Sequence, residues 1–364
     1  MNYKIYVYAI SKNEEKFVNR WMDSVKEADG IFVLDTGSTD NTVELLKKKG
    51  AVVKKKIFKK FRFDEARNLS LKMVPKDADI CLCIDIDEVL EDNWREKLEN
   101  IWEKGLTRLR YNYIWSHNKY GNPAINFYSE KIHSRNGYRW IHPVHEILIY
   151  DGTEKIKTVD NFTISHYPDN KKSRSSYLPL LELSIKEDPK NDRNMHYLGR
   201  EYMYYKMYNK SIDTLIKHLN LDSATWKDER SASMRFIARN YKSLKRFDEA
   251  RMWLSKAKNE TPYLREPYVE SGMLEYELKN YENAMKDLEI ALKNKKPYKS
   301  YINEAFCYDG TIYDILSICK FYTGKIAEAL YYIDLALEKK PKNKRILNNK
   351  KLIKKALKNE NNKN

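Results

Sequence analysis

Two carboxylates stand at the end of an apolar stretch, in the segment Cys81-Leu-Cys-Ile-Asp-Ile-Asp-Glu88. Side chains alternate between the two faces of a strand, so Asp85 and Asp87 share one side. Such an apolar run predicts a strand buried on both faces, as in a parallel sheet. Buried carboxylates need a neutralising partner, and a hard divalent cation is the usual one at the carboxyl end of a strand. The spacing therefore indicates a metal site, with solvated caps of a strand end as the alternative.

A third acid, Asp35, ends a second buried strand and precedes a polar turn at residues 36–42. Gly37 permits a tight bend in this turn, and its polar residues are able to cap the following helix. Because the carboxyl ends of parallel strands meet at one edge of a sheet, we expect Asp35 to lie near Asp85 and Asp87. Three converging acids favour a functional site over a merely structural edge.

Strands and helices alternate in the part of the chain that positions these acids. We expect four strands with helices between them, at residues 3–10, 30–35, 51–53 and 80–87. The helix that begins at Phe63 carries Arg67 and Asn68 toward the same end of the sheet. This alternation predicts the α/β class with a doubly wound sheet.

Residues 108–166 have a different character, because aromatic-rich, strand-like pieces surround a polar segment at 136–146. We expect a mixed or antiparallel extension of the sheet with long loops. The polar segment collects Arg, Trp, two His and a Glu, so it is a candidate for substrate contact. Each histidine taken alone is more often an ordinary surface or core residue.

From Ser173 onward the sequence is helical throughout. A large residue is followed three positions later by a small one in four places, which begin at Tyr208, Phe247, Tyr281 and Ile326. Ala250 and Ala284 are 34 residues apart, which is the tetratricopeptide period, and the other spacings are longer. We predict four helical hairpins in a short solenoid, each small residue lying in a second helix, with a basic terminal helix at the end.

The tyrosine-rich helix over 194–208 is a candidate for a concave binding face, with simple core packing as the alternative. Of Tyr204 and Tyr205 we expect one to face outward and one inward. The solenoid is also a candidate surface for a homodimer.

The chain of 364 residues is long enough for two domains and has no apolar run of membrane-spanning length. We expect a soluble, cytoplasmic protein, since its amino terminus is typical of a first strand and not of a signal peptide. Its four cysteines are too few for a disulfide scaffold and are expected to be reduced core residues.

The net charge of +16 raises the question of a nucleic-acid partner, but residues 341–364 alone hold nine Lys or Arg against one Glu. A basic tail is able to contact phosphates or an acidic surface, although a solvated helix also explains it. No nucleic-acid-binding motif is recognisable, so we expect no such partner.

The ordered motifs resemble those of the family 2 glycosyltransferases of GT-A fold. They are Ser11-Lys-Asn-Glu-Glu15, Asp35-Thr-Gly-Ser-Thr-Asp40, Ala66-Arg-Asn68, Asp85-Ile-Asp-Glu88 and His145-Glu146. With the repeats behind them, the chain is similar to the subgroup that includes the peptide S-glycosyltransferases of glycocins. The resemblance implies a glycosyltransferase domain at 1–172, a tetratricopeptide-like domain at 173–340 and a basic helix and tail at 341–364. Many relatives have Ala where Ile86 stands, but that side chain points away from the metal.

The resemblance implies inverting transfer of a hexose from a nucleotide diphosphate sugar, expected to be a UDP-sugar, to a peptide, protein or glycan. It implies a donor-binding set of Ser11, Asn13, Glu14, Asp35, Ser38, Asp40, Arg67, Asn68 and Asp85. Within it, Ser11, Glu14, Asp35 and Asp40 would hold the base and ribose, and Arg67 would lie near the diphosphate or donor sugar.

The same resemblance implies that Asp87 ligates Mn²⁺ or Mg²⁺ and that Asp85 contacts ribose or metal-bound water. His166, at the end of the last strand, is the candidate third ligand. An inverting transfer needs a general base, for which Glu146 is the candidate because it follows the metal motif in the acceptor-side segment. His145 is able to exchange roles with either.

Three other interpretations remain. A nucleotidyltransferase would have a glycine-rich loop after the first strand, where this chain has Ser-Lys-Asn-Glu-Glu. A catalytically inactive repeat scaffold is disfavoured by the intact acids and Arg67. A glycosyltransferase for a surface glycan or lipid-linked saccharide differs only in its acceptor.

Overall fold

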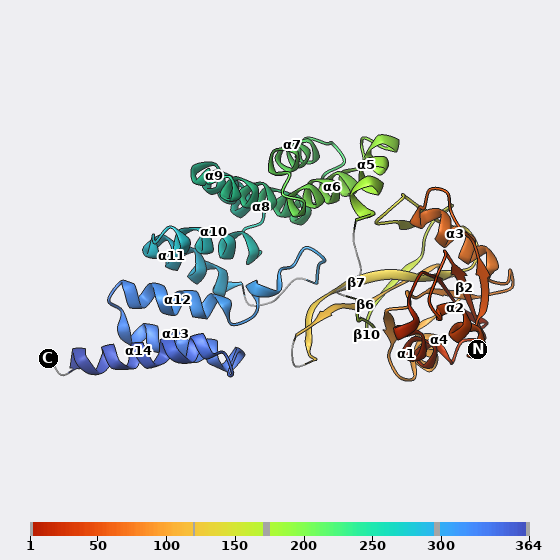
Figure 1. Ribbon diagram of the computed structural model, residues 1–364, viewed down its shortest axis with the longest axis horizontal. Helices are drawn as coiled ribbons and strands as arrows, with labels where there is room; N and C mark the ends of the chain where they lie inside the picture. Colours follow the sequence, from red (N-terminus) through yellow and green to blue (C-terminus); the bar gives the residue numbers. More distant parts are fainter. Residues whose placement is uncertain (1–2, 119–120, 170–174, 295–298, 362–364) are drawn as a thin grey trace. The chain divides into compact units, whose positions relative to one another are not determined.

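The computed structural model describes residues 3–118, 121–169, 175–294 and 299–361 (Figure 1). The chain forms two compact units, Met1–Asp188 and Pro189–Asn364. Helix α5 (Tyr177–Glu187) belongs to the first unit, where Arg62 donates to Glu187. The boundary expected near residue 172 falls before this helix. None of the described helices is both long enough and apolar enough to cross a lipid bilayer.

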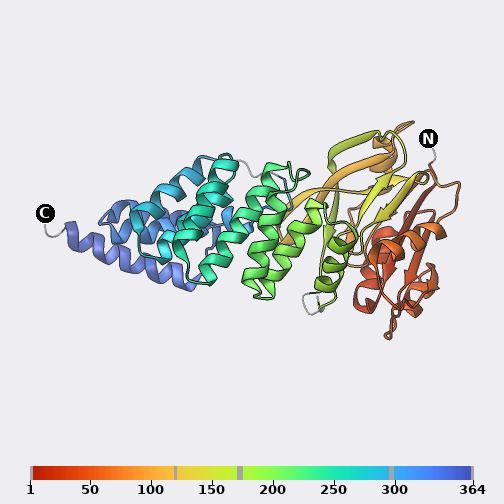
Figure 2. The ribbon, with the colours of Figure 1, turned by 90° about the horizontal axis from the view of Figure 1, so that it is seen from above.

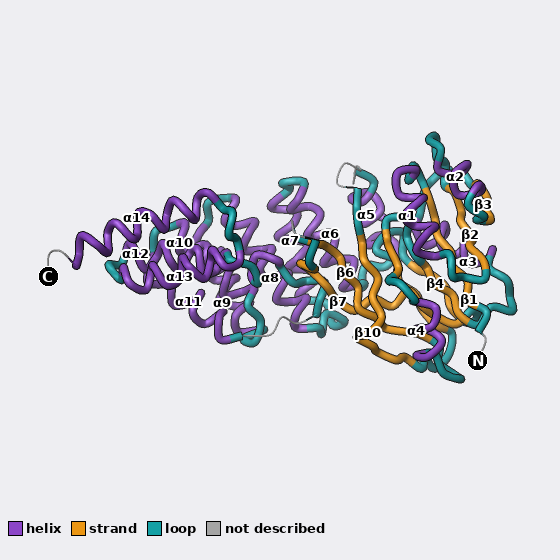
Figure 3. The backbone as a smooth tube through the Cα atoms, turned by 90° about the horizontal axis from the view of Figure 1, so that it is seen from below, coloured by secondary structure: helices purple, strands orange, loops and turns teal. Residues whose placement is uncertain are grey.

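Among the described residues, the first unit contains an eight-stranded mixed sheet in the order β3-β2-β1-β4-β7-β6-β10-β5 (Figure 3). These strands are β1 (Ile5–Ser11), β2 (Gly30–Asp35), β3 (Val52–Lys55), β4 (Ile80–Cys83), β5 (Glu88–Leu90), β6 (Arg108–His117), β7 (Pro123–Ser134) and β10 (Ile156–His166). The first four in the order are parallel, and β7 joins β4 antiparallel. The expected α/β sheet with a mixed extension is confirmed.

Helices cover both faces of this sheet. Side chains of α1 (Glu15–Val25), α2 (Thr42–Lys48) and α4 (Trp94–Ile101) join Ile80 and Leu82 of β4 in one core. On the other face, Cys81 and Cys83 pack with α3 (Phe63–Met73) and a separate ribbon of β8 (Tyr138–Ile141) and β9 (Ile147–Tyr150). The alternating apolar pattern therefore gives a strand buried on both sides.

Two expectations about these strands are wrong. Strand β4 ends at Cys83 and not near residue 87, because the chain turns there and the Glu88 N–H donates to the Asp85 carbonyl at 2.8 Å. The segment 136–146 is not all loop, since Tyr138–Ile141 pairs with β9 as strand β8. The predicted metal motif thus lies on a turn between two strands.

The second unit consists of helical hairpins (Figure 2). Its pairs are α6 (Asp192–Tyr204) with α7 (Tyr208–Leu219), α8 (Lys227–Ser243) with α9 (Phe247–Glu260), α10 (Glu266–Glu277) with α11 (Tyr281–Lys293), and α12 (Thr311–Tyr322) with α13 (Ile326–Lys339). A short 3₁₀ helix, η1 (Ala305–Cys307), precedes α12, and α14 (Lys344–Asn361) follows α13. All four second helices begin at the predicted residues.

The small residues of the repeat pattern explain how closely these helices pair. Ser211, Ala250, Ala284 and Ala329 are fully buried. The Ser211 hydroxyl donates to the Gly199 carbonyl at 2.6 Å, so this small side chain of α7 lies directly on the backbone of α6. A larger side chain would separate the pair, which is why the pattern marks the second helix.

Tyr204 and Tyr205 are both exposed, by 55% and 42%, so the expectation of one inward side chain is wrong. Tyr204 is the last residue of α6 and Tyr205 its C-cap, where the chain leaves the helix. At the end of the helix, buried and exposed side chains no longer follow the helical spacing.

Candidate functional site

Asp35, at the end of β2, is buried and accepts several hydrogen bonds from the turn that follows it. Its carboxylate accepts hydrogen bonds from the hydroxyls of Ser11 at 3.0 Å and Ser38 at 2.5 Å. It also accepts from the backbone N–H groups of Gly37 and Ser38, at 3.2 and 3.0 Å. Charge-assisted bonds of this kind are strong, so Asp35 holds the turn against β1.

The loop after β1 interlocks with the same turn. The Asn13 N–H donates to Ser38 Oγ at 2.9 Å, and Asn13 Oδ1 accepts the Thr39 N–H at 2.8 Å. The Glu14 N–H donates to Thr42 Oγ1 at 2.7 Å, whose hydroxyl donates to Asp40. Burial raises the pKa of Asp40, but hydrogen bonds from Thr42 outweigh it and lower the pKa below its ordinary value.

Six of the predicted donor-binding residues therefore lie together at the carboxyl ends of β1 and β2. These are Ser11, Asn13, Glu14, Asp35, Ser38 and Asp40. Their polar groups bind one another, which fixes the two loops before any ligand arrives.

Arg67, on α3, joins two acids of different motifs. Its guanidinium donates to both oxygens of Asp85, at 2.8 and 3.2 Å, and its Nε donates to Glu146. The guanidinium also lies over the Trp140 ring, 5.1 Å from its centroid. Burial raises the pKa of Asp85, but the charges of Arg67 and Lys131 outweigh it and hold the pKa well below its ordinary value.

Lys131, on β7, is a site residue that the sequence did not indicate. Its Nζ lies 3.0 Å from Asp85 Oδ2 and 2.5 Å from Glu88 Oε1. Glu88 is buried and also accepts from the Tyr113 hydroxyl at 2.7 Å. The sequence pattern predicted a strand over Ile125–Ser129, which leaves Lys131 outside it, whereas β7 continues to Ser134 and brings Lys131 to the acids.

Asp87 lies beside His166, although 78 residues separate them in the sequence. His166 Nε2 is 3.3 Å from Asp87 Oδ2, and His166 Nδ1 is 3.0 Å from the Trp115 carbonyl. Burial lowers the pKa of His166, but the hydrogen bond and charge of Asp87 outweigh it and raise the pKa. The Trp115 indole stacks on the imidazole at 4.5 Å and is 45% exposed.

Two of the three predicted metal ligands, Asp87 and His166, thus lie together, and the third, Asp85, binds other partners. Asp87 and His166 face each other, whereas Asp85 is engaged by Arg67 and Lys131. Within the described ranges, no three His, Cys, Asp or Glu side chains converge as a metal cage. A carboxylate and an imidazole still fit a cation that takes its other ligands from water and substrate phosphates.

Asn68 holds the β8–β9 ribbon in place. Its amide donates to the Trp140 carbonyl and accepts the Trp140 N–H, both at 2.8 Å. This pairing uses the side chain that we expected to contact the donor. The ribbon leads to His145, which has φ +51° and a ring 5.8 Å from that of Tyr177, and to Glu146.

Comparison with known proteins identifies a family for part of the chain. Residues 6–151 match the model of the glycosyl transferase family 2. No curated protein matches the chain.

Similar solved structures include MamA, which is 19% identical over 46% of this chain and 89% of its own, with a TM-score of 0.38. They also include PilF of Pseudomonas aeruginosa, 12% identical over 50% of this chain and 74% of its own, with a TM-score of 0.39. A tetratricopeptide protein of Thermus thermophilus is 19% identical over 50% of this chain and 90% of its own, with a TM-score of 0.33. The first unit of this protein carries a glycosyl transferase family 2 domain, and helical hairpins follow it.

Proposed function

We propose that the protein is a metal-dependent inverting glycosyltransferase that moves a hexose from a UDP-sugar to a peptide or protein. The observation that carries this proposal is the pairing of Asp87 with His166, beside Asp85, Arg67 and Lys131, in a domain that matches the family. A carboxylate beside an imidazole, next to carboxylates paired with Arg67 and Lys131, suits a divalent cation and a charged donor.

Asp87 and His166 would hold the cation, whose chemistry is to neutralise the leaving diphosphate. Mg²⁺ is a hard ion that prefers oxygen ligands, so the imidazole nitrogen favours Mn²⁺. The charges around the site support this reading. Asp85, Asp87, Glu88 and Glu146 outnumber the two neighbouring cations, and a divalent ion would balance them.

The donor would lie against the interlocked loops at the ends of β1 and β2. Arg67 and Lys131 keep Asp85 ionised, which supports its role as an acceptor for a ribose hydroxyl or metal-bound water. Asn68 would act indirectly, by holding the ribbon that carries Glu146.

Glu146 would be the general base. It would take the proton of the acceptor nucleophile as the new bond forms at the anomeric carbon and the bond to the diphosphate breaks. One guanidinium links Glu146 and Asp85, so Arg67 sets the base relative to the donor pocket. His145 precedes it and is the alternative base.

The acceptor has two candidate classes. Helical hairpins next to a transferase domain favour a peptide or protein. The exposed Trp115 ring beside His166 suits stacking on a sugar, which favours a glycan or lipid-linked saccharide instead. The four buried free cysteines agree with a cytoplasmic location, and the helical unit is the candidate surface for a homodimer.

A panel of nucleotide sugars, read by release of nucleoside diphosphate with and without Mn²⁺, tests the proposal. We expect one UDP-sugar to be hydrolysed or transferred only with the metal, and Asp87→Asn to abolish that release. No release from any donor, with the fold intact by circular dichroism, would favour an inactive scaffold.

A further inference from the structure

A segment between two helices of the second unit lies across the hairpins and not along them. This crossing segment, residues 299–308, joins α11 to α12 after residues that lie outside the description. It corresponds to the longest spacing of the repeat pattern, between Ala284 and Ala329. Its side chains and backbone contact the first helices of three pairs, α6, α8 and α10.

The first contact of the crossing segment is aromatic. The Tyr301 ring stacks near Tyr197 of α6, with centroids 6.0 Å apart, and meets the Trp226 ring at 5.3 Å. Its hydroxyl donates to Glu229 of α8. Ile302 follows and packs with Ala232 and Leu264.

The second contact is made to the backbone of the crossing segment. Arg235 of α8 donates to the Ile302 carbonyl at 3.2 Å. Glu266 of α10 accepts the backbone N–H of Glu304 at 3.3 Å and a hydrogen bond from the side-chain amide of Asn303 at 2.9 Å. The Asn303 N–H donates to the Ser300 carbonyl at 3.2 Å, so Arg235 and Glu266 bind the backbone of a short turn and the polar residues that follow it.

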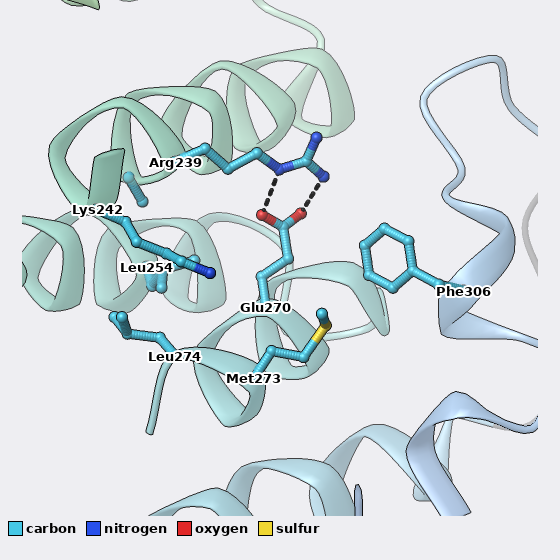
Figure 4. A pocket seen from close by; sticks show the side chains of 8 residues that line it. Arg239, Lys242, Leu254, Glu270, Met273, Leu274 and Phe306 are labelled. Atoms are coloured by element: carbon cyan, nitrogen blue, oxygen red, sulfur yellow. Dashed lines mark hydrogen bonds and ion pairs between the residues drawn. The ribbon is translucent and has the colours of Figure 1, made fainter. Parts of the chain in front are cut away.

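The third contact is a carboxylate on an arginine. Arg239 donates to Glu304 at 2.5 Å and holds both oxygens of Glu270 at 2.8 Å, as Figure 4 shows for the latter pair. A cavity of about 200 Å³ adjoins this position between α8, α10 and Phe306. Figure 4 shows Phe306 pointing toward Met273 and Glu270.

Few apolar contacts join residues 301–304 to the helices beneath them. Ile302 and Tyr301 belong to a small cluster that is separate from the cores of α7–α9 and α10–α12. The other contacts of residues 301–304 are the ring contacts of Tyr301, hydrogen bonds and ion pairs, and water is able to replace the polar ones. Segments with few apolar contacts open at a lower free energy than the global transition. Cys307 is buried in the core of α10–α12 and would keep the segment attached at one end.

We propose that residues 301–304 are an internal ligand, displaceable by another peptide with an aromatic residue, an aliphatic residue, an asparagine and an acid in succession. The residues of α6, α8 and α10 beneath the segment, with Trp226 just before α8, supply these contacts. Tyr197 and Trp226 take the aromatic ring, Arg235 and Glu266 take the backbone, and Arg239 takes the carboxylate. This inference does not depend on the transfer reaction.

The test uses the full chain and a fluorescein-labelled peptide of residues 299–306, Lys-Ser-Tyr-Ile-Asn-Glu-Ala-Phe. Fluorescence anisotropy compares the native protein with the variant Tyr301→Ala/Glu304→Gln, in which the internal copy is weakened. We expect the variant to bind the peptide at least tenfold more tightly than the native protein does. The reason is that the weakened residues 301–304 of the chain no longer compete with the free peptide for the same contacts. The same peptide with Gln for its Glu should lose about tenfold or more, since a charge-assisted bond is lost.

Two results would overturn the inference. One is the absence of peptide binding to a variant that keeps its helical circular dichroism. The other comes from hydrogen exchange of the native protein, and it decides the matter even if the variant does not fold. We expect the amides of residues 301–304 to exchange at least tenfold faster than those of the α8 interior. Equal protection would mean that the segment is a permanent part of the core.

Discussion

His166 Nε2 and Asp87 Oδ2 lie 3.3 Å apart, one at the end of β10 and the other on the turn between β4 and β5. The pairing of these strands brings the two together, because His166 is opposite Glu88 in the antiparallel register of β10 and β5. The candidate metal pair is therefore a product of sheet topology, and each half is open to a separate test.

Asp87→Asn and His166→Gln should each lower metal-dependent transfer by about 10³-fold, because a bound cation supplies several kcal/mol of transition-state stabilisation. Mn²⁺ binding, followed by calorimetry on the protein with UDP, should weaken in both variants while the circular dichroism is unchanged. Asp92→Asn, an exposed carboxylate nearby, is the matched control. Normal Mn²⁺ binding by both site variants would place the cation elsewhere.

Glu146→Gln should lower the transfer rate by about 10²–10⁴-fold with little change in donor affinity, because the amide keeps the shape of the carboxylate and loses its basicity. Single-turnover kinetics at saturating donor separates the two effects. Glu65→Gln on the exposed side of α3 is the control. If His145→Ala is inactive and Glu146→Gln is not, the histidine is the base.

Lys131→Met should destabilise the first unit by about 3–5 kcal/mol, because it leaves two partly or fully buried carboxylates with one cation fewer. Urea denaturation measures this loss. The matched control is Lys155→Met, whose ion pair with Glu103 is exposed and should contribute far less to stability. Adding Glu88→Gln to Lys131→Met should recover part of the loss. A Lys131→Met loss no larger than that of the control would contradict the assignment.

The parts of this structure that the sequence predicted are those that depend on local pattern. The large-then-small step marks the start of a second helix because the small residue is needed where two neighbouring helices touch, as at Ser211 and Ala250. Alternation along β4 predicted its two buried faces in the same way.

The parts that were missed depend on contacts between distant segments. Strand β8 forms where Asn68 holds Trp140, a pairing across 72 residues that no local pattern reveals. Lys131 sits among polar residues and acquires its partners only when β7 joins β4. Glu304 of the crossing segment likewise finds Arg239 across 65 residues. The Asp87–His166 pair was anticipated only through the family resemblance.

Three hairpins of the second unit turn through a lysine in the left-handed conformation, Lys206, Lys245 and Lys279, with φ of 59°, 59° and 62°. The fourth has Gly324 in the same place. A side chain costs about 1–2 kcal/mol there, partly offset by the greater freedom of glycine when unfolded. Lys245→Gly should therefore stabilise the protein by about 0.5–1 kcal/mol in urea denaturation. Lys286→Gly, in the interior of α11, should instead destabilise it by a similar amount. If Lys245→Gly and Lys286→Gly change the stability equally, the left-handed conformation of Lys245 does not cost stability.

The stability of the helical unit should fall as the pH is lowered from 7 to 5. His196 of α6 is buried with Nδ1 2.7 Å from Ser233 Oγ, and burial lowers the pKa of His196 from 6.5 to about 3. Below pH 6.5 the unfolded chain therefore binds a proton at His196 that the folded chain does not bind. The free energy of unfolding falls for this reason between pH 6.5 and 3. At pH 5 the loss is about 2 kcal/mol from this one group. Burial raises the pKa of Glu229, but His218 and its other partners outweigh it and lower the pKa to about 2. Glu229 therefore changes the stability only below pH 4.5 and does not affect the comparison of pH 7 with pH 5. Urea denaturation at pH 7 and 5 should show a smaller difference for His196→Gln than for the native protein, by about 2 kcal/mol. An unchanged difference would assign the pH dependence to other groups.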